Sequence, residues 1–184
     1  MRLDEQAPEL DVTEWIGPPR QLADQRGQVV LVKTFQMLCP GCVAYGLPQA
    51  KRVQQAFPEV VVVGLHTVFE HHEAMGRTSL RAFLSEYRID FPVGIDRHDG
   101  DPVPVTMRRY ALQGTPSTLL IDRAGRLVAS AFGEVHDLSL GAQLGRMLAE
   151  PVEAQPVDAE GESAPAVTGD TTHGQVCRPG ADCT

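Results

Sequence analysis

Cys39 and Cys42 are the residues whose spacing most clearly predicts chemistry. They stand two residues apart, between an apolar, β-branched run and a segment of helical character, 43–56. Such a spacer brings the two sulfurs within reach of a disulfide. The first turn of a helix stabilises a thiolate through its unpaired N–H groups and the positive end of its dipole, and the thiolate is the nucleophilic form of cysteine. The pattern predicts a redox-active dithiol, with Cys39 as the exposed nucleophile and Cys42 more buried.

The residues between the cysteines agree with this interpretation. Pro40 suits the first helical turn, because the N–H group that proline lacks is not needed there. We expect Pro40 and Gly41 to contribute to the substrate-binding surface. The alternative is half of a zinc site, which requires a second pair of Cys or His ligands at a matching spacing. The sequence contains no second CxxC, so we expect neither a metal nor a cofactor at the dithiol.

The pattern of the whole chain predicts an α/β fold. Two largely apolar runs, 29–35 and 60–65, flank the helix after the dithiol, and this order predicts a parallel pair of strands with a right-handed crossover. Gly46 and Pro48 predict a kink in the intervening helix. Further strands are expected around Trp15 and Ile16 and at 91–95, 117–122 and 126–132, with a hairpin turn at 123–125 and further helices after Thr78, at 103–112 and at 138–149.

Apolar positions define the faces on which two later helices should pack. Thr78 or Ser79 is expected to cap the first of these helices. The buried faces follow the helical period and are expected to be Leu80, Phe83, Leu84 and Tyr87 in that helix, and Leu138, Leu140, Leu144 and Leu148 in the final one.

Thr115-Pro116 is the second element of the predicted site. It precedes a strand that should lie beside the run 29–35. A cis proline here would leave the Thr115 backbone free to pair with an extended substrate next to Cys39. A trans proline at the start of a strand is the commoner state, and the residues themselves leave both possibilities open.

These features together resemble the thioredoxin superfamily over residues 7–149, and within it the TlpA-like or redoxin branch. The matching elements are the first strand, Cys39-Pro40-Gly41-Cys42, the proline-containing helix, Thr115-Pro116, the hairpin and the last helix. The resemblance implies a thioredoxin-like fold, with a central mixed β-sheet flanked by helices, an N-terminal extension and an inserted strand and helix. It also implies a cis Pro116, a nucleophilic Cys39 and a resolving Cys42.

Two residues depart from the thioredoxin pattern. Lys33 stands six positions before Cys39, where thioredoxins carry an acidic residue, and Leu38 replaces the usual aromatic residue before the first cysteine. A charged Lys33 would favour a nearby thiolate but could not accept a proton. A buried one would be partly neutral, because desolvation lowers the pKa of a lysine. The alternative is that Lys33 pairs with a carboxylate or extends to the edge of the sheet.

Peroxide reduction is not expected to be the main activity. Peroxiredoxins share this fold, but they place a Thr or Ser three residues before the reactive cysteine, whereas this chain has Gln36 there.

A second polar cluster follows the second strand. It comprises His66, Glu70, His71, His72 and Glu73, and it should lie at the active-site edge of the sheet. Imidazole and carboxylate groups are ligands for zinc or iron, but adjacent histidines diverge on most backbones. We expect a polar rim or a partner-binding loop rather than a metal site.

Charge is unevenly distributed along the chain. The net charge is −8, and residues 150–184 contain seven acidic residues and one basic residue. We interpret 1–149 as the thioredoxin-like domain, 150–172 as an acidic flexible linker and 173–184 as a C-terminal segment. A turn at Pro179-Gly180 would bring Cys177 and Cys183 together as a second dithiol that exchanges with the first. A weak metal clip, or no role at all, is the alternative for this pair.

The sequence as a whole predicts a thiol–disulfide oxidoreductase. The nearly neutral body excludes the basic surface of a nucleic-acid-binding protein. No apolar run is long enough to span a membrane and the N-terminus lacks a signal-peptide core, so we expect a cytoplasmic reductase acting on a protein or small-molecule disulfide, with an electron donor that the sequence does not identify. Two alternatives are a copper-binding module that uses both cysteines as soft ligands and a redox sensor on the same fold.

Overall fold

The central sheet of the protein is mixed. The computed structural model describes residues 2–150, and the sheet has the strand order β1-β4-β3-β2-β5-β6. Strand β3 pairs parallel with both β2 and β4. The other three pairings, β1 with β4, β5 with β2 and β6 with β5, are antiparallel. The α/β fold with a mixed sheet is therefore confirmed. The strands are β1 (Val12–Ile16), β2 (Val29–Phe35), β3 (Val60–His66), β4 (Val93–Asp96), β5 (Ser117–Ile121) and β6 (Leu127–Phe132).

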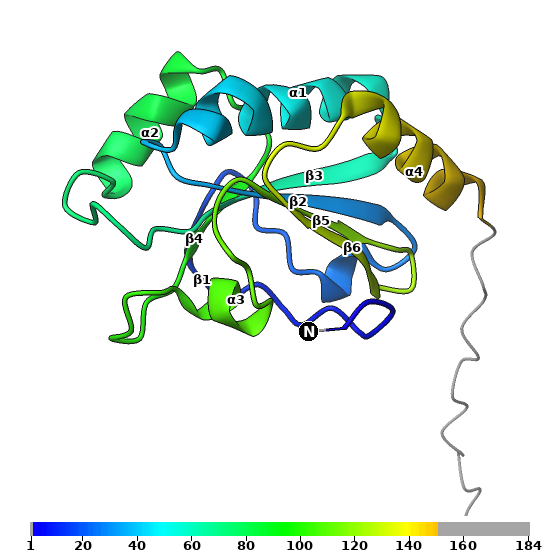
Figure 1. The fold of residues 1–184 in the computed structure, drawn as a ribbon, viewed down its shortest axis with the longest axis horizontal. Coiled ribbons are helices and arrows are strands. Elements are labelled where there is room, and N and C mark those ends of the chain that lie inside the picture. Colours follow the sequence, from blue (N-terminus) through cyan, green and yellow to red (C-terminus); the bar gives the residue numbers. More distant parts are fainter. Residues whose placement is uncertain (1, 151–184) are drawn as a thin grey trace, which may run out of the picture. The chain divides into compact units, whose positions relative to one another are not determined.

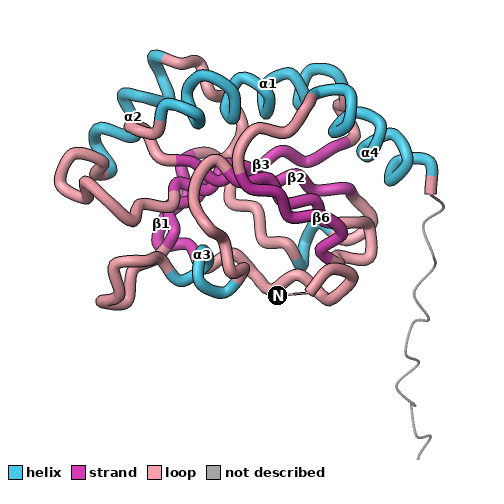
Figure 2. The backbone as a smooth tube through the Cα atoms, in the orientation of Figure 1, coloured by secondary structure: helices cyan, strands magenta, loops and turns pink. Residues whose placement is uncertain are grey.

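Helices cover the two faces of the sheet unequally. The three longer helices, α1 (Leu47–Ala56), α2 (Arg77–Glu86) and α4 (Asp137–Ala149), lie on one face, and the short α3 (Val105–Arg109) lies on the other (Figure 1). A 3₁₀ turn, η1 (Ala23–Gln25), precedes β2, and a π turn, η2 (Cys42–Gly46), precedes α1. In Figure 2 the strands form a layer between these two sets of helices.

Strand β2 is the centre of the fold. All seven of its residues are buried, and alternate side chains point to opposite faces, as the pleat of a strand requires. Phe35 contributes to the cluster beneath α1, α2 and α4. Val32 contributes to the cluster on the other face, together with Tyr110 and with Leu10 of the N-terminal segment. The expected parallel pair is confirmed, since β2 pairs in register with β3 along its whole length.

The kink expected at Gly46 and Pro48 takes the form of the π turn. The N–H group of Leu47 bonds to the carbonyl of Cys42, five residues earlier. Pro48 cannot donate a backbone hydrogen bond at the next position, and the chain changes from π to α geometry at this point. The wide turn directly follows the first helical residues, Pro40 and Gly41, so the dithiol lies on the irregular end of the helix.

Three predicted details of the helices are wrong. Helix α2 begins at Arg77 after an extended Gly76, and neither Thr78 nor Ser79 caps it. Tyr87 follows the end of α2 and is 47% exposed. Leu138 is 78% exposed, because side chains two positions apart point to nearly opposite sides of a helix and Leu140 occupies the buried side.

Several predictions concern residues outside the described range. The acidic linker beyond residue 150 and the second dithiol, Cys177 and Cys183, fall there. Within residues 2–150, no helix is both long and apolar enough to cross a membrane.

Candidate active site

The two predicted redox cysteines lie in contact at the start of the helical run. Cys39 is half-buried and Cys42 is fully buried, and both are free thiols. Their Sγ atoms are 2.7 Å apart, with Cys42 placed to donate to Cys39, and the backbone N–H of Cys42 also donates to Cys39 Sγ at 3.2 Å. The Cys39 carbonyl accepts the first helical hydrogen bond, from Val43. The expected difference in burial between the two cysteines is therefore present.

This geometry assigns different chemistry to the two sulfurs. Cys39 Sγ accepts hydrogen bonds from an S–H group and from a first-turn N–H group, and it donates to the Thr115 carbonyl. Burial, assisted by the contact with Cys39, raises the pKa of Cys42 to about 12. The accessible sulfur is therefore the one suited to attack, and the buried sulfur is held as a thiol.

Pro116 packs directly against the helical segment that carries the cysteines. The Thr115–Pro116 peptide bond is cis, as the resemblance implies. The Thr115 carbonyl lies 3.4 Å from Cys39 Sγ. A Cβ atom on Gly46 would lie 2.9 Å from Pro116 Cβ, closer than real Cβ contacts, so only glycine allows this approach. The structure thus brings together Cys39, Cys42, Thr115 and Pro116.

Lys33 is buried, which is one of the two possibilities for this residue, and the alternative, that it pairs with a carboxylate or extends to the sheet edge, is wrong. Its side chain is 1% exposed. Its Nζ donates to Gln49 Oε1 at 2.9 Å and to the Thr118 hydroxyl. Both partners are neutral, and burial lowers the pKa of Lys33 to about 8 against the opposing effect of nearby Cys42. The central position of β2 places the amine in the interior, since every residue of the strand is covered.

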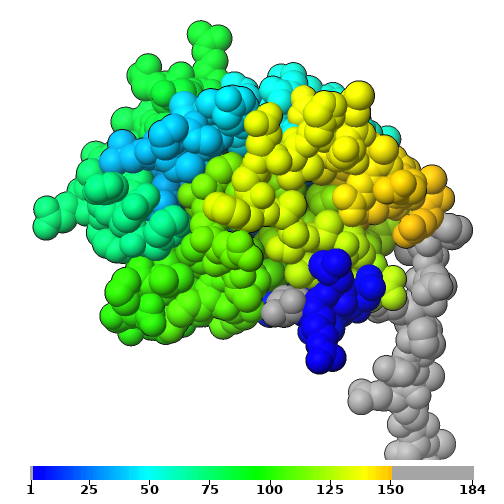
Figure 3. All heavy atoms as spheres, in the orientation of Figure 1, coloured from blue at the N-terminus to red at the C-terminus, as the bar shows by residue number. Residues whose placement is uncertain are grey.

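Gln49 links Lys33 to the start of α4. Its Nε2 donates to the Val135 carbonyl at 2.6 Å and to Asp137 Oδ1 at 2.7 Å. Asp137 in turn forms an ion pair with Arg52 at 2.9 Å, and this ion pair, then the bond from Gln49, lower the pKa of its carboxyl group. Figure 3 shows the yellow segment that begins α4 lying against the blue segment at the start of α1.

Sequence reasoning missed Gln49 and Asp137. A signal for the first was available, because Gln49 is a polar residue among the buried helix positions Leu47, Ala50 and Val53. Asp137 is an ordinary acidic residue in a first helical turn, and the sequence gives no sign that it meets a residue 88 positions away.

The histidine cluster after β3 does not assemble. His66 is the last residue of β3 and is 2% exposed, beside the ring of Phe35, so it is not part of a polar rim. His71 is exposed, and exposed His72 meets His98 of another loop, with ring centroids 5.0 Å apart. Within residues 2–150, no group of three or more His, Cys, Asp or Glu side chains is arranged to hold a metal ion.

Gln36 makes hydrogen bonds through both its side chain and its backbone carbonyl. It is 1% exposed, and its side chain accepts from the N–H of Phe69 at 3.2 Å and donates to Glu70 at 3.4 Å. Its carbonyl accepts from the N–H of Cys39 at 3.3 Å. Gln36 therefore ties the loop before Cys39 to the loop after β3.

Two exposed apolar side chains border the dithiol. Leu38 and Phe132 are each 57% exposed. The Phe132 ring packs over Gly114, because a Cβ atom added to Gly114 would lie 2.8 Å from Phe132 Cε2. Gly114 directly precedes Thr115. The site therefore has an apolar border on both the cysteine loop and the proline loop.

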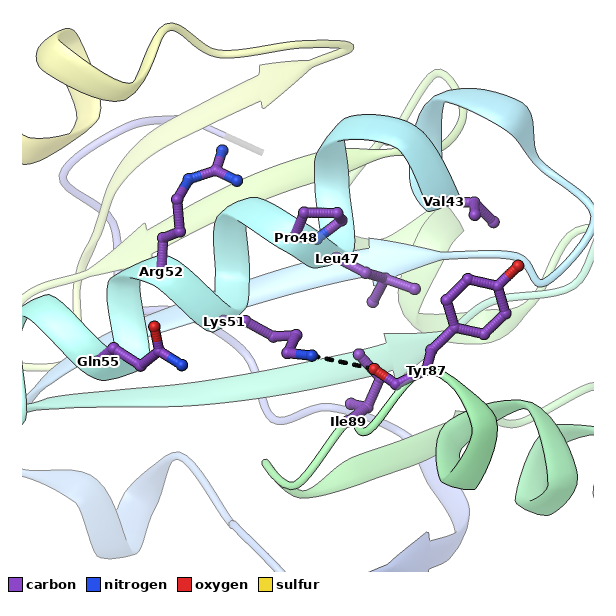
Figure 4. A pocket seen from close by; sticks show the side chains of 8 residues that line it. All are labelled: Val43, Leu47, Pro48, Lys51, Arg52, Gln55, Tyr87 and Ile89. Atoms are coloured by element: carbon purple, nitrogen blue, oxygen red, sulfur yellow. Dashed lines mark hydrogen bonds between the residues drawn. The ribbon is translucent and has the colours of Figure 1, made fainter.

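A separate pocket of about 270 Å³ lies on the outer side of α1, facing the end of α2. Figure 4 shows its lining, in which Lys51 donates to the Tyr87 carbonyl at 3.0 Å. The lining begins at Val43, the residue after Cys42, but contains neither sulfur. The pocket is therefore distinct from the dithiol site.

A mixed sheet of this order, with a CxxC at a helix start facing a cis proline, defines a thioredoxin-like thiol–disulfide oxidoreductase. The chain matches the AhpC/TSA family over residues 3–130 and belongs to that family.

Several known proteins are similar to this chain, and two of them are named for thiol–disulfide chemistry. A crystal structure of a thioredoxin-like superfamily protein is 53% identical, covers 80% of this chain and 99% of its own, and has a TM-score of 0.78. A thiol-disulfide isomerase from Corynebacterium glutamicum is 46% identical over 79% of this chain and 98% of its own, with a TM-score of 0.75. The thiol-disulfide oxidoreductase ResA of Bacillus thuringiensis (strain Al Hakam) is 24% identical over 73% of this chain and 72% of its own length.

Proposed function

We propose that this oxidoreductase reduces disulfides through a mixed disulfide between Cys39 and its substrate. The contact between the two sulfurs carries the proposal, since Cys42 Sγ lies 2.7 Å from Cys39 Sγ and is placed to attack whatever sulfur Cys39 has captured. The Cys39 thiolate attacks the substrate disulfide, and one substrate sulfur leaves as a thiolate. Cys42 then attacks Cys39, which releases the second substrate thiolate and leaves a Cys39–Cys42 disulfide.

The substrate we propose is an extended segment that carries a disulfide beside apolar side chains. The Thr115 carbonyl, next to Cys39 Sγ, offers a backbone acceptor to such a segment, and exposed Leu38 and Phe132 offer apolar contact on either side. Pro40 and Gly41 complete the surface around the sulfur. A small disulfide would use only the Cys39 contact.

The reducing direction follows from the compartment we propose, the cytoplasm, where thiols are kept mostly reduced. An external dithiol must then return two electrons to the Cys39–Cys42 disulfide after each turnover. A titration against glutathione tests the direction. A potential near −270 mV, about that of thioredoxin, supports a reductase, whereas a potential near −120 mV would indicate an oxidant.

Trapping tests the assignment of the two cysteines. In a full-length chain that carries Cys177→Ser and Cys183→Ser, the Cys42→Ser variant should accumulate a mixed disulfide with a disulfide-containing peptide, visible by mass spectrometry. The Cys39→Ser variant should form none. Equal trapping by the two variants would contradict the assignment, and bound copper retained by the reduced protein would favour the metal-binding alternative.

A further inference from the structure

The pocket on the outer side of α1 takes no part in the dithiol chemistry described above. Two walls form it, one from the helical segment and one from the residues after α2 (Figure 4). The helical wall includes a stripe of side chains four positions apart, Val43, Leu47, Lys51 and Gln55. Side chains at this spacing lie on one side of a helix. The stripe is therefore apolar at the end nearer the dithiol and polar at the other end.

Apolar side chains supply most of the pocket surface. Leu47 is fully buried, and Val43 and Ile89 are half-buried. The opposite wall includes Tyr87, whose exposed ring packs against Phe83 with the ring centroids 4.4 Å apart. Such aromatic pairs hold each other in place, so the Tyr87 ring is a fixed wall. A ligand that fills the pocket therefore needs an apolar body.

Lys51 is the charged group that the pocket offers to a ligand. Its Nζ donates to the Tyr87 carbonyl at 3.0 Å (Figure 4), and this bond holds the ammonium against the apolar surface. An ammonium has three donors, and among residues 2–150 Lys51 has no other hydrogen bond and no ion pair. Arg52, the second cation of the lining, is already paired with Asp137 of α4 at 2.9 Å. The charge of Lys51 is therefore left without a carboxylate partner in the described part of the chain.

The donors in the pocket suit a carboxylate better than a phosphate. Phosphate sites combine several donors, such as the free N–H groups at a helix start or a bidentate arginine. Lys51 lies in the interior of α1, where the backbone N–H groups are used within the helix. The lining has no acidic residue that would repel an anion. One free ammonium, with the amide of Gln55 one helical turn away, matches a single negative charge.

We propose that this pocket binds a small monocarboxylic acid with an aromatic or branched apolar body. The carboxylate accepts from Lys51, and the body lies over Leu47 and Ile89 against the Tyr87 ring. The volume of about 270 Å³ is just below the range for drug-sized ligands, so the acid should have roughly ten to fifteen non-hydrogen atoms. The pocket contains neither sulfur of the dithiol, and the inference does not depend on the proposed disulfide exchange.

Binding of 4-phenylbutyrate to the full chain tests the proposal. In an NMR titration of the ¹⁵N-labelled protein, the acid should shift the backbone signals of Val43, Lys51 and Ile89. We expect a Kd below about 1 mM, because a ligand with so few atoms binds weakly even in a well-matched site. The alcohol 4-phenyl-1-butanol has the same body without the charge. It should bind about three- to tenfold more weakly, since a hydrogen bond to a charged acceptor is stronger than one to a neutral acceptor.

Two variants locate the charge that the acid recognises. Lys51→Met keeps an unbranched apolar side chain and removes the ammonium. It should lower the affinity for the acid about three- to tenfold and leave the affinity for the alcohol unchanged. Arg146→Met is the matched control, because Arg146 is an exposed cation of α4 that does not line the pocket. It should bind both probes as the parent does.

Amine labelling gives a second measurement that needs no variant. The chain contains two lysines, Lys33 and Lys51, and Lys33 is fully buried. An acetylating reagent should therefore modify Lys51 and the N-terminal amine, and mass spectrometry follows the two sites separately. Saturating 4-phenylbutyrate should slow the acetylation of Lys51 several-fold. The N-terminal amine should react at an unchanged rate.

The outcomes that overturn the proposal are distinct from those that concern the dithiol. Equal affinity for the acid and the alcohol, or an equal loss of both in Lys51→Met, would show that the pocket does not recognise a carboxylate. Unshifted signals at Val43, Lys51 and Ile89 in millimolar acid would show that the pocket is not a site for this class of ligand. Either result would leave the exchange chemistry of Cys39 and Cys42 untouched.

Discussion

A Cβ atom on Gly46 would lie 2.9 Å from the Cβ atom of Pro116. This contact joins the π turn after Cys42 to the loop that carries the cis peptide bond, and no other residue type leaves room for it. The relative position of the dithiol and the Thr115 carbonyl therefore depends on Gly46 having no side chain.

Gly46→Ala should separate these two loops. We expect a loss of about 1–3 kcal/mol in the free energy of unfolding, since an extra methyl group is forced into a packed contact, and a slower reaction of peptide disulfides. Chemical denaturation and a turnover assay measure the two effects. Gly145→Ala is the matched control, because Gly145 lies in α4 with open space around its Cβ position, and there alanine should be neutral or stabilising. Equal losses in both variants would mean that the contact with Pro116 has no special importance.

The apolar border of the site should matter for peptides and not for small disulfides. Phe132→Ala removes a 57% exposed ring beside the proline loop. We expect kcat/KM for a disulfide-containing peptide to fall by roughly 3- to 10-fold, because part of the apolar contact with the substrate is lost, with no change for glutathione disulfide. Leu3→Ala, at a 54% exposed apolar residue remote in sequence, serves as the control. An equal fall in kcat/KM for the peptide and for glutathione disulfide would mean that Phe132 supports the geometry of the proline loop and does not contribute to peptide recognition.

The buried amine should also leave a signature in stability. Lys33 has a pKa of about 8 in the folded protein against an ordinary value of 10.5. Between these values the unfolded chain binds more protons, so the contribution of Lys33 to stability increases with pH in that window. Below pH 8 its full cost is present. Lys33→Met should therefore be more stable than the parent at pH 7, and the advantage should shrink by up to about 1.4 kcal/mol per pH unit above pH 8.

Denaturation of the parent and of Lys33→Met at pH 7, 8 and 9 measures this difference. The comparison cancels the titration of groups that do not interact with Lys33, such as Tyr110, because both proteins contain them. A constant difference over this range would show that the folded amine keeps its proton up to pH 9, so that burial does not lower its pKa to about 8.

The local elements of the site could be predicted from the sequence, and the contacts beneath it could not. A β-branched run, a CxxC and a helix are continuous in sequence, so their order alone placed Cys39 at a helix start. The Thr115-Pro116 pair could be placed because the strand after it pairs with β2. Lys33 was recognised as unusual, but its partner Gln49 lies 16 positions away and Asp137 is 88 positions further from Gln49. Such contacts depend on how α1 and α4 pack together, which the periodicity of either helix leaves undetermined, as the exposure of Leu138 also shows.

His66 is a second buried basic side chain, and its burial should lower the free energy of unfolding at acid pH. Burial lowers its pKa to about 4, from an ordinary 6.5, and within the described residues its Nε2 atom has no hydrogen-bond partner. Below pH 6.5 the unfolded chain takes up a proton that folded His66 resists, so stability should fall as the pH drops toward 4. His66→Leu fills a similar volume without a titratable group and should reduce this acid-dependent loss, by up to about 1.4 kcal/mol per pH unit between pH 6.5 and 4.

The control for this prediction is His71→Asn, at an exposed histidine with a φ of 50°. Asparagine tolerates that backbone conformation, and the side chain is not buried, so the acid dependence should match that of the parent. Denaturation series at pH 4.5, 5.5 and 6.5 give the slopes. If His66→Leu kept the parent slope, the loss of stability in acid would have to come from other groups, and the buried imidazole would be protonated or solvated in the folded state.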